Sequence, residues 1–221
     1  MKKNRTEILC WVLAALPLAA TLCCLPTLPA RIPMHWNIAG EIDSWGGRGS
    51  AFFVPLLALG LNLMFAVLPK IDPRRANYAR FAGAYMVFRL VYNLFMLGMT
   101  IITLVSAYRP GSLAVGQLVS AGIGALFCVL GNYMPRFKPN YFIGIRTPWT
   151  LASEQVWYQT HRLGGVLWFW GGLAVFAASF LLPSSALFAA MMAVIVVIGL
   201  VPTAASYFYY RALPADGGDE P

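Results

Sequence analysis

The chain has 221 residues, of which 59% are hydrophobic and only 11% are charged. Soluble domains usually have about a quarter of their residues charged, so this composition excludes that class and indicates a membrane protein. The formal net charge of +8 is explained by basic loops that lie against anionic lipid, and we expect no direct nucleic-acid partner.

Six apolar segments are long enough to cross the lipid bilayer, because a spanning helix needs roughly 20 apolar residues. We expect spans at residues 8–25, 51–68, 82–107, 113–131, 164–182 and 186–210. The basic start before the first apolar run resembles a signal peptide, but the run is too long for one, and we expect it to be retained. We expect a single membrane domain over residues 1–221. Its two long loops are an outer loop at 26–50 and an inner loop at 132–163, and a disordered tail follows at 212–221.

The distribution of cations predicts the orientation, because short loops rich in Lys and Arg stay in the cytoplasm. With the N-terminus inside, three arginines fall outside: Arg31, Arg48 and Arg109. The other loop and terminal cations fall inside: Lys2, Lys3, Arg5, Lys70, Arg74, Arg75, Arg80, Arg136, Lys138, Arg146, Arg162 and Arg211. We therefore expect a multi-pass protein of the bacterial cytoplasmic membrane with both termini in the cytoplasm. The predicted fold is an all-α six-transmembrane-helix bundle with a short extracytoplasmic β-hairpin-like loop and a cytoplasmic interfacial helix.

The outer loop reads RIPMHWNIAGEIDSWGGRG. Ile32, Met34 and Trp36 alternate with other side chains at a period of two, which is typical of a strand. Ala39 and Gly40 can turn the chain, so a second short strand is expected from Glu41. Two interpretations stay open, namely a lid packed on the bundle and a surface that meets an extracellular partner.

Arg89 is the ionisable residue within a predicted span. The apolar run 90–107 that follows it is nearly long enough to cross the bilayer alone. We therefore expect Arg89 at the inner boundary of the membrane, with its head group reaching the lipid headgroups. A buried ion pair or a ligand-binding role is the alternative. Elsewhere, residues at a spacing of four that include small side chains indicate close helix packing: Gly116, Ser120 and Gly124 in one span, and Gly164, Trp168 and Gly172 in another.

The inner loop contains IGIRTPWTLASEQVWYQTHRLGG. Thr147 is the expected N-cap of a helix with Pro148 at its first position, and Arg146 before it makes a candidate anion site. Glu154, Trp157 and His161 follow at helical spacing, so we expect them on one face of an interfacial helix. That face either contacts a soluble partner or anchors to lipid.

The remaining sequence carries no pattern of an enzyme site. The two histidines, His35 and His161, are expected on opposite sides of the membrane, so a metal site cannot use both. A nucleophile elbow, a phosphate loop and a CxxC pair do not occur in the sequence. We predict no enzymatic activity, no cofactor and no metal.

The outer stretch IPMHWNIAGEIDSWGGR resembles an outer-loop domain of unknown function, and the inner stretch resembles the signature of the SdpI family. This family comprises bacterial membrane proteins named for an immunity protein against the sporulation-delaying toxin. Arg48 stands where the outer pattern has Lys, after an extra Gly. By position, the residues matching the two patterns are His35, Trp36, Asn37, Gly40, Asp43, Asn140, Gly144, Arg146, Thr147, Pro148, Trp149, Thr150, Glu154, Trp157, His161 and Arg162.

The resemblance implies resistance to a secreted peptide toxin and sequestration of a transcriptional repressor at the cytoplasmic face. The implied partners are therefore the lipid bilayer, an extracellular peptide toxin and a cytoplasmic repressor protein. Two other functions stay open at this point: a small transporter or channel for a peptide or lipid, and a membrane enzyme.

Overall fold

Six long helices dominate the computed structural model, which describes residues 2–214. Each is long and apolar enough to cross a membrane. Their bounds are α1 Lys2–Cys24, α2 Phe53–Ile71, α3 Ala82–Tyr108, α4 Val115–Tyr133, α6 Glu154–Leu181 and α7 Ser184–Arg211. The predicted fold class, a membrane bundle of six helices with a short hairpin, is confirmed. Most of the predicted disordered tail, residues 215–221, lies outside the described part.

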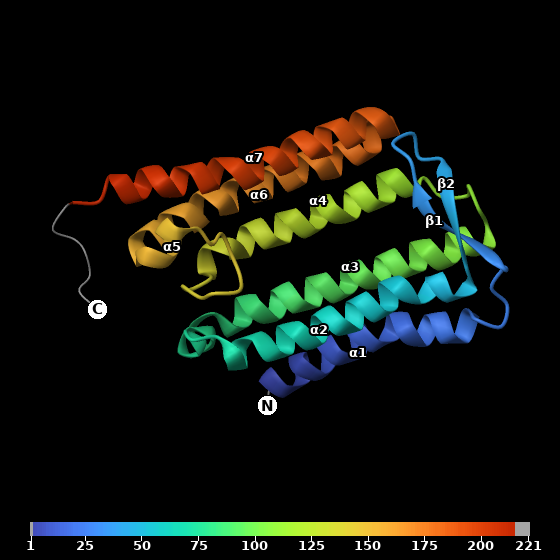
Figure 1. Ribbon diagram of the computed structural model, residues 1–221, viewed down its shortest axis with the longest axis horizontal. Coiled ribbons are helices and arrows are strands. Elements are labelled where there is room, and N and C mark those ends of the chain that lie inside the picture. Colours follow the sequence, from blue (N-terminus) through green and yellow to red (C-terminus); the bar gives the residue numbers. More distant parts are fainter. Residues whose placement is uncertain (1, 215–221) are drawn as a thin grey trace.

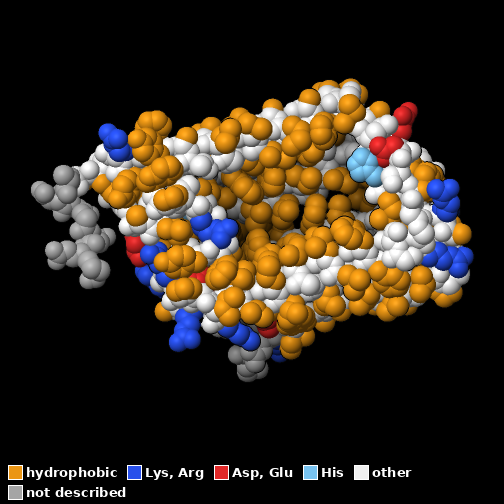
Figure 2. Space-filling view, in the orientation of Figure 1, with side chains coloured by type: hydrophobic (Ala, Val, Ile, Leu, Met, Phe, Trp, Pro, Cys, Tyr) orange, Lys and Arg blue, Asp and Glu red, His pale blue; other side chains and the backbone are white. Residues whose placement is uncertain are grey.

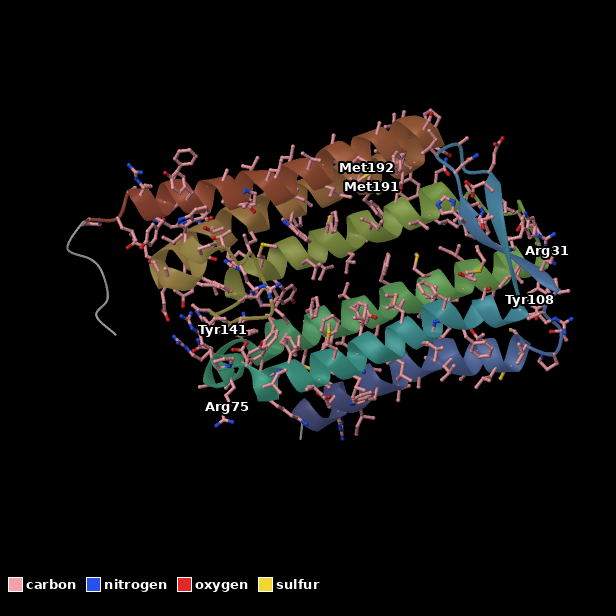
Figure 3. The ribbon with its side chains drawn as sticks, in the orientation of Figure 1. Arg31, Arg75, Tyr108, Tyr141, Met191 and Met192 are labelled. Carbon is pink, nitrogen blue, oxygen red and sulfur yellow. The ribbon has the colours of Figure 1, made fainter. Side chains whose placement is uncertain are left out.

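The helices form two groups of three, α1 with α2 and α3, and α4 with α6 and α7 (Figure 1). A hairpin covers one end, which we call the hairpin end, and its strands are β1 Arg31–Trp36 and β2 Ile42–Gly47. At the opposite end, which we call the loop end, lie the start of α1, the end of α7 and the short helix α5, Pro148–Ala152. Figure 3 shows Arg31 and Tyr108 at the hairpin end and Arg75 and Tyr141 at the loop end.

Helices α4 and α6 pack with their backbones in contact. A Cβ atom on Gly124 would lie 2.7 Å from the carbonyl oxygen of Gly172, and one on Gly131 would lie 2.7 Å from that of Gly165. Small residues permit such an approach between membrane helices. The packing role predicted for Gly124 and Gly172 is therefore seen, whereas Gly164 faces the side chain of Ile145 in the inner loop.

Apolar side chains cover the flanks of the helices in Figure 2, and basic side chains gather at the two ends. The figure also shows a hollow between the two groups of helices. A cavity of about 650 Å³ there is lined by apolar side chains of α3 and α4. The apolar flanks of the helices are expected where lipid replaces water as the solvent.

The hairpin is antiparallel, with Arg31 opposite Gly47 and Trp36 opposite Ile42. Its turn places Gly40 at a φ of +85°, a conformation that a residue with a Cβ adopts only with strain. The base of the hairpin is anchored by Ile32, which is fully buried in a cluster with Leu28, Ala51, Leu104 and Ala107. The hairpin is thus fixed to the ends of α1 and α3.

The continuous interfacial helix expected after Thr147 is broken into two pieces. Helix α5 ends at Ala152, and Ser153 is extended with φ −140° and ψ 126°. Its hydroxyl accepts a hydrogen bond from the N–H of Val156 and so caps α6. Helix α6 then runs unbroken to Leu181, so the span expected at 164–182 begins ten residues earlier, at Glu154.

Candidate functional site

Motif residues of the outer pattern build the hairpin turn. The side-chain oxygen of Asn37 accepts hydrogen bonds from the N–H groups of Ala39 at 2.9 Å and Glu41 at 3.0 Å. The Nδ1 atom of His35 lies 2.6 Å from a carboxylate oxygen of Asp43, across the two strands. Both partners are exposed, and an exposed pair contributes about 0–1 kcal/mol, so these residues fix the local shape more than the stability.

The hairpin also contacts the far group of helices. A Cβ atom on Gly40 would lie 3.2 Å from the hydroxyl oxygen of Ser184, the first residue of α7. Gln117 of α4 donates to the same hydroxyl at 3.3 Å. The turn therefore rests on the junction of α4 and α7, while Ile38 and Trp45 remain 60% and 42% exposed.

At the loop end, Asn140 shapes the chain around it. Its side chain is fully buried, and its nitrogen donates to the carbonyl groups of Lys138 and Ile143, both at 2.9 Å. Its oxygen accepts from the N–H groups of Phe142 at 2.9 Å and Ile143 at 2.7 Å. A buried amide with this many partners fixes one loop conformation, so Asn140 acts as a scaffold.

Gly144, Trp157 and His161 form a second part of that scaffold. The ring of His161 stacks on Trp157 with centroids 4.0 Å apart, and both side chains are fully buried. The Nε2 atom of His161 accepts from the N–H of Ile145 at 3.1 Å, so Nδ1 carries the proton and donates to the carbonyl of Trp157 at 2.8 Å. Gly144 has φ +109°, and a Cβ there would lie 2.3 Å from Nε2. The ring is therefore neutral and enclosed.

The predicted cap at Thr147 is present. The hydroxyl of Thr147 accepts from the N–H of Thr150 at 3.2 Å, and the hydroxyl of Thr150 accepts from the N–H of Thr147 at 2.9 Å. The Thr147 hydroxyl also lies 2.9 Å from the hydroxyl of Ser206, which is buried in α7. The capping box thereby attaches the inner loop to the end of α7.

The connection between α2 and α3 holds the inner loop from the other side. Asp72 is 1% exposed and accepts hydrogen bonds from Tyr78 at 3.1 Å and from the N–H of Tyr141 at 3.0 Å. Asn77 donates to the carbonyl of Pro139 at 2.8 Å. Sequence reasoning missed these residues, since a carboxylate among cations is typical of a solvated surface.

Among the inner-pattern residues, three charged side chains are exposed: Arg146, Glu154 and Arg162. Arg146 donates to the carbonyl of Tyr141 at 2.6 Å. The expectation that Trp157 and His161 share an exposed face with Glu154 is wrong, because both rings are fully buried. Trp149 is half-buried against the ring of Tyr207, with centroids 5.1 Å apart, and Pro148 is exposed.

Arg89 does not reach toward lipid headgroups, and that expectation is wrong. Its side chain is 2% exposed, and Nη1 donates to both carboxylate oxygens of Glu7 at 2.8 and 2.9 Å. Nη2 donates to Asn62 at 3.2 Å, and Asn93 donates to the same oxygen at 3.0 Å. The alternative, a buried ion pair, describes this residue, because a charge inside the membrane needs a partner.

Two family comparisons match the two patterned loops. Residues 136–206 match the SdpI/YfhL protein family, and residues 12–59 match a domain of unknown function, DUF1648. The immunity protein SdpI of Bacillus subtilis is 27% identical over 214 residues, which cover 96% of this chain and 98% of that protein. No solved structure matches the chain.

Across residues 2–214, no group of three or more His, Cys, Asp and Glu side chains is arranged to hold a metal ion. The arrangement at each end is instead a buried scaffold that carries exposed side chains. The match at residues 12–59 contains the whole hairpin, and the match at residues 136–206 contains most of the inner loop. The chain is thus similar to the SdpI/YfhL protein family over residues 136–206, to DUF1648 over residues 12–59, and to an immunity protein over nearly its full length.

Proposed function

We propose that the protein confers resistance to a secreted peptide toxin on the cell that carries it, and that it acts without enzymatic turnover or a cofactor. The observation that carries this proposal is the similarity to the immunity protein SdpI over nearly the full length of both chains. The architecture supports it, because each end of the bundle holds an ordered loop with exposed side chains suited to contact a partner.

In this proposal the loop end faces the cytoplasm and the hairpin end faces outward. The positive-inside rule supports that orientation. The loop-end segments carry Lys70, Arg74, Arg75, Arg80, Arg136, Lys138, Arg146, Arg162 and Arg211, whereas the hairpin-end segments carry Arg31, Arg48 and Arg109. Both described ends of the chain then lie on the cytoplasmic side.

The toxin-binding surface in this proposal is the hairpin. Ile38 in the turn and Trp45 on β2 present exposed apolar side chains, and Asn37 holds the turn rigid. Exposed aromatic and aliphatic groups on a fixed backbone are the usual anchors for a peptide. His35 and Asp43 add a polar pair beside them.

The repressor-binding surface in this proposal is the exposed set Arg146, Glu154 and Arg162 at the loop end. These charges stand on the buried scaffold of Asn140 and His161, so a soluble protein would meet a fixed pattern of charge. Electrostatic complementarity of that kind sets partner choice more than affinity.

Helix α7 provides a physical connection between the two surfaces. Its first residue, Ser184, lies against Gly40 of the hairpin, and Ser206 near its other end lies against Thr147 of the inner loop. A toxin that binds one position of α7 more tightly than another would shift the inner loop, since a ligand moves an equilibrium only through differential affinity.

The direct test is a toxin challenge in a Bacillus subtilis strain that lacks its own immunity protein. We expect expression of the wild-type chain to restore growth in the presence of the sporulation-delaying peptide. Trp45→Ala should lose protection, and Arg146→Ala combined with Arg162→Ala should keep protection while losing recruitment of the repressor to the membrane fraction.

Arg80→Ala is the matched control for the inner surface, because Arg80 is exposed at the same end but lies outside the inner loop. Growth no better than that of the empty strain, with the protein present in the membrane at normal amount, would refute the immunity proposal. Equal repressor recruitment by the Arg146→Ala, Arg162→Ala variant and by wild type would refute the inner surface alone.

A further inference from the structure

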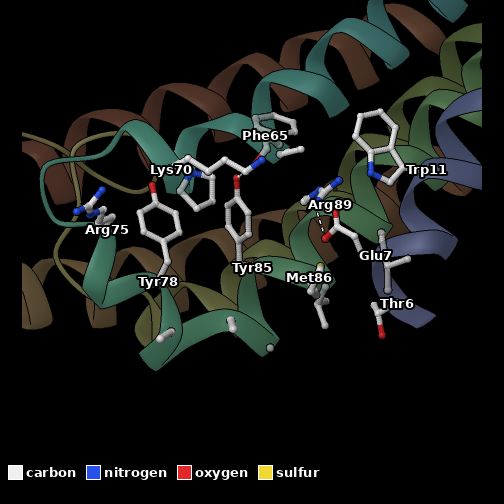
Figure 4. Close-up of a pocket in the computed structure, with 17 residues that line it drawn as sticks. Thr6, Glu7, Trp11, Phe65, Lys70, Arg75, Tyr78, Tyr85, Met86 and Arg89 are labelled. Atoms are coloured by element: carbon white, nitrogen blue, oxygen red, sulfur yellow. Dashed lines mark hydrogen bonds and ion pairs between the residues drawn. The ribbon is translucent and has the colours of Figure 1, made fainter. Parts of the chain in front are cut away.

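A cavity of about 1010 Å³ lies at the loop end between the start of α1, the end of α2 and the start of α3. This volume is at the upper end of the range of roughly 300–1,000 Å³ that small-molecule sites occupy. In Figure 4, Arg75 and Tyr78 lie at one end of the cavity, and Glu7, Arg89 and Trp11 lie at the other. The proposed toxin and repressor surfaces do not use these residues.

Positive charge is in excess among the side chains that line the cavity. Arg89 is neutralised by Glu7. Lys70 and Arg75 are exposed, and neither takes part in the ion pairs found within residues 2–214. The lining therefore carries two cations without an acidic partner in the described chain, and a site of this kind favours an anion.

The nearby phenol groups are already used by the protein. Tyr78 donates to the buried carboxylate of Asp72 at 3.1 Å, and Tyr85 donates to the carbonyl of Phe65. These two hydroxyl groups are therefore engaged, whereas Lys70 and Arg75 are exposed cations that a ligand can meet.

The remainder of the wall is apolar. Trp11 of α1, Phe65 of α2, and Met86 and Leu90 of α3 line it. A free inorganic anion would pair with the cations and leave this wall uncovered. An amphiphile with an anionic head and a hydrocarbon tail satisfies both parts of the cavity, because apolar surface removed from water is stabilising.

We propose that this cavity binds one anionic phospholipid of the surrounding bilayer. Its phosphate lies between Lys70 and Arg75, and an acyl chain lies along Trp11, Phe65 and Leu90. Basic pockets between membrane helices bind anionic headgroups in this way. The inference does not depend on the immunity proposal, since it rests on the cavity and its charges alone.

The test is native mass spectrometry of the full-length protein in detergent micelles with added phosphatidylglycerol or phosphatidylcholine. The variant is Lys70→Gln combined with Arg75→Gln. Each cation should contribute about fivefold to retention of the anionic lipid, so the ratio of phosphatidylglycerol-bound to free protein should fall roughly 25-fold. Phosphatidylcholine, which has no net charge, should be retained weakly by both proteins.

The matched control is Arg31→Gln combined with Arg48→Gln, which removes the same charge from the hairpin end. The control should keep at least a third of the wild-type ratio, and both double variants should melt within a few degrees of wild type. An equal loss in the control would show general surface attraction and overturn the site. Equal retention of both lipids, or full displacement of phosphatidylglycerol by inorganic phosphate, would overturn it as well.

Discussion

The ion pair between Glu7 and Arg89 offers the sharpest test of how this bundle is held together. Glu7→Gln removes the charge but keeps the length of the side chain. Arg89 is 2% exposed and would then lose its counter-ion while keeping Asn62 as a neutral acceptor at 3.2 Å. Its Nε atom already lacks a hydrogen-bond partner, so the cation has few other ways to be satisfied.

The size of the effect follows from the burial of the two partners. Breaking a buried ion pair on one side costs about 3–5 kcal/mol, since it leaves an uncompensated charge. The side chain of Glu7 is 38% exposed, which indicates that solvent screens part of the attraction. We therefore expect Glu7→Gln to lower the free energy of unfolding by about 2–4 kcal/mol.

The double variant, Glu7→Gln with Arg89→Met, removes both charges and should recover most of that loss, because replacing a buried pair by neutral side chains is often nearly neutral. The assay is reversible unfolding in mixed micelles of rising dodecyl sulfate content, followed by circular dichroism. Glu41→Gln in the exposed turn is the control and should change stability by less than about 0.5 kcal/mol.

The reasoning would be refuted if Glu7→Gln cost less than about 1 kcal/mol. The single variant Arg89→Met completes the comparison. The reasoning would also be refuted if the loss of unfolding free energy in the double variant equalled the sum of the losses in the two single variants, since a direct ion pair requires a coupling free energy of about 0.5–3 kcal/mol.

Three further substitutions test the scaffold. Gly144→Ala should destabilise the inner loop by at least about 1–3 kcal/mol, because φ is +109° and the new Cβ would meet His161; unchanged thermal melting would contradict this. Thr147→Val should cost about 1 kcal/mol for the cap and further stability for the contact with Ser206, while Thr147→Ser keeps both and should melt close to wild type. Gly124→Leu should push α4 away from α6, so size-exclusion chromatography should show loss of the monodisperse peak, and a normal peak would show that the helices separate freely.

Much of the architecture could be predicted from the sequence because the bilayer restricts what a chain can do. A run of about 20 apolar residues in lipid must satisfy its own backbone, and a helix does so. The hairpin was predictable from the alternation of Ile32, Met34 and Trp36 and from the turn at Gly40, and the cap was predictable from Thr147 followed by Pro148. These features are local.

The partners of buried polar groups could not be predicted in the same way. Arg89 and Glu7 are 82 residues apart, and Asp72 meets Tyr141 across 69 residues. From the sequence alone, their side chains are expected at the membrane boundary or at the surface, because their partners lie on distant segments. Trp157 and His161 also read as one face with Glu154, because helical spacing alone does not say which side packs inward.

The sequence by itself therefore determined the membrane class, the number of long helices, the hairpin and the resemblance to the SdpI family, because each depends on local composition or on a contiguous motif. Only the tertiary structure decided which motif residues are scaffold and which are surface. Burial depends on contacts between segments far apart in the chain, such as α7 against Thr147 and the α2–α3 connection against the inner loop. A polar side chain becomes a scaffold when those contacts remove it from solvent and supply its hydrogen-bond partners.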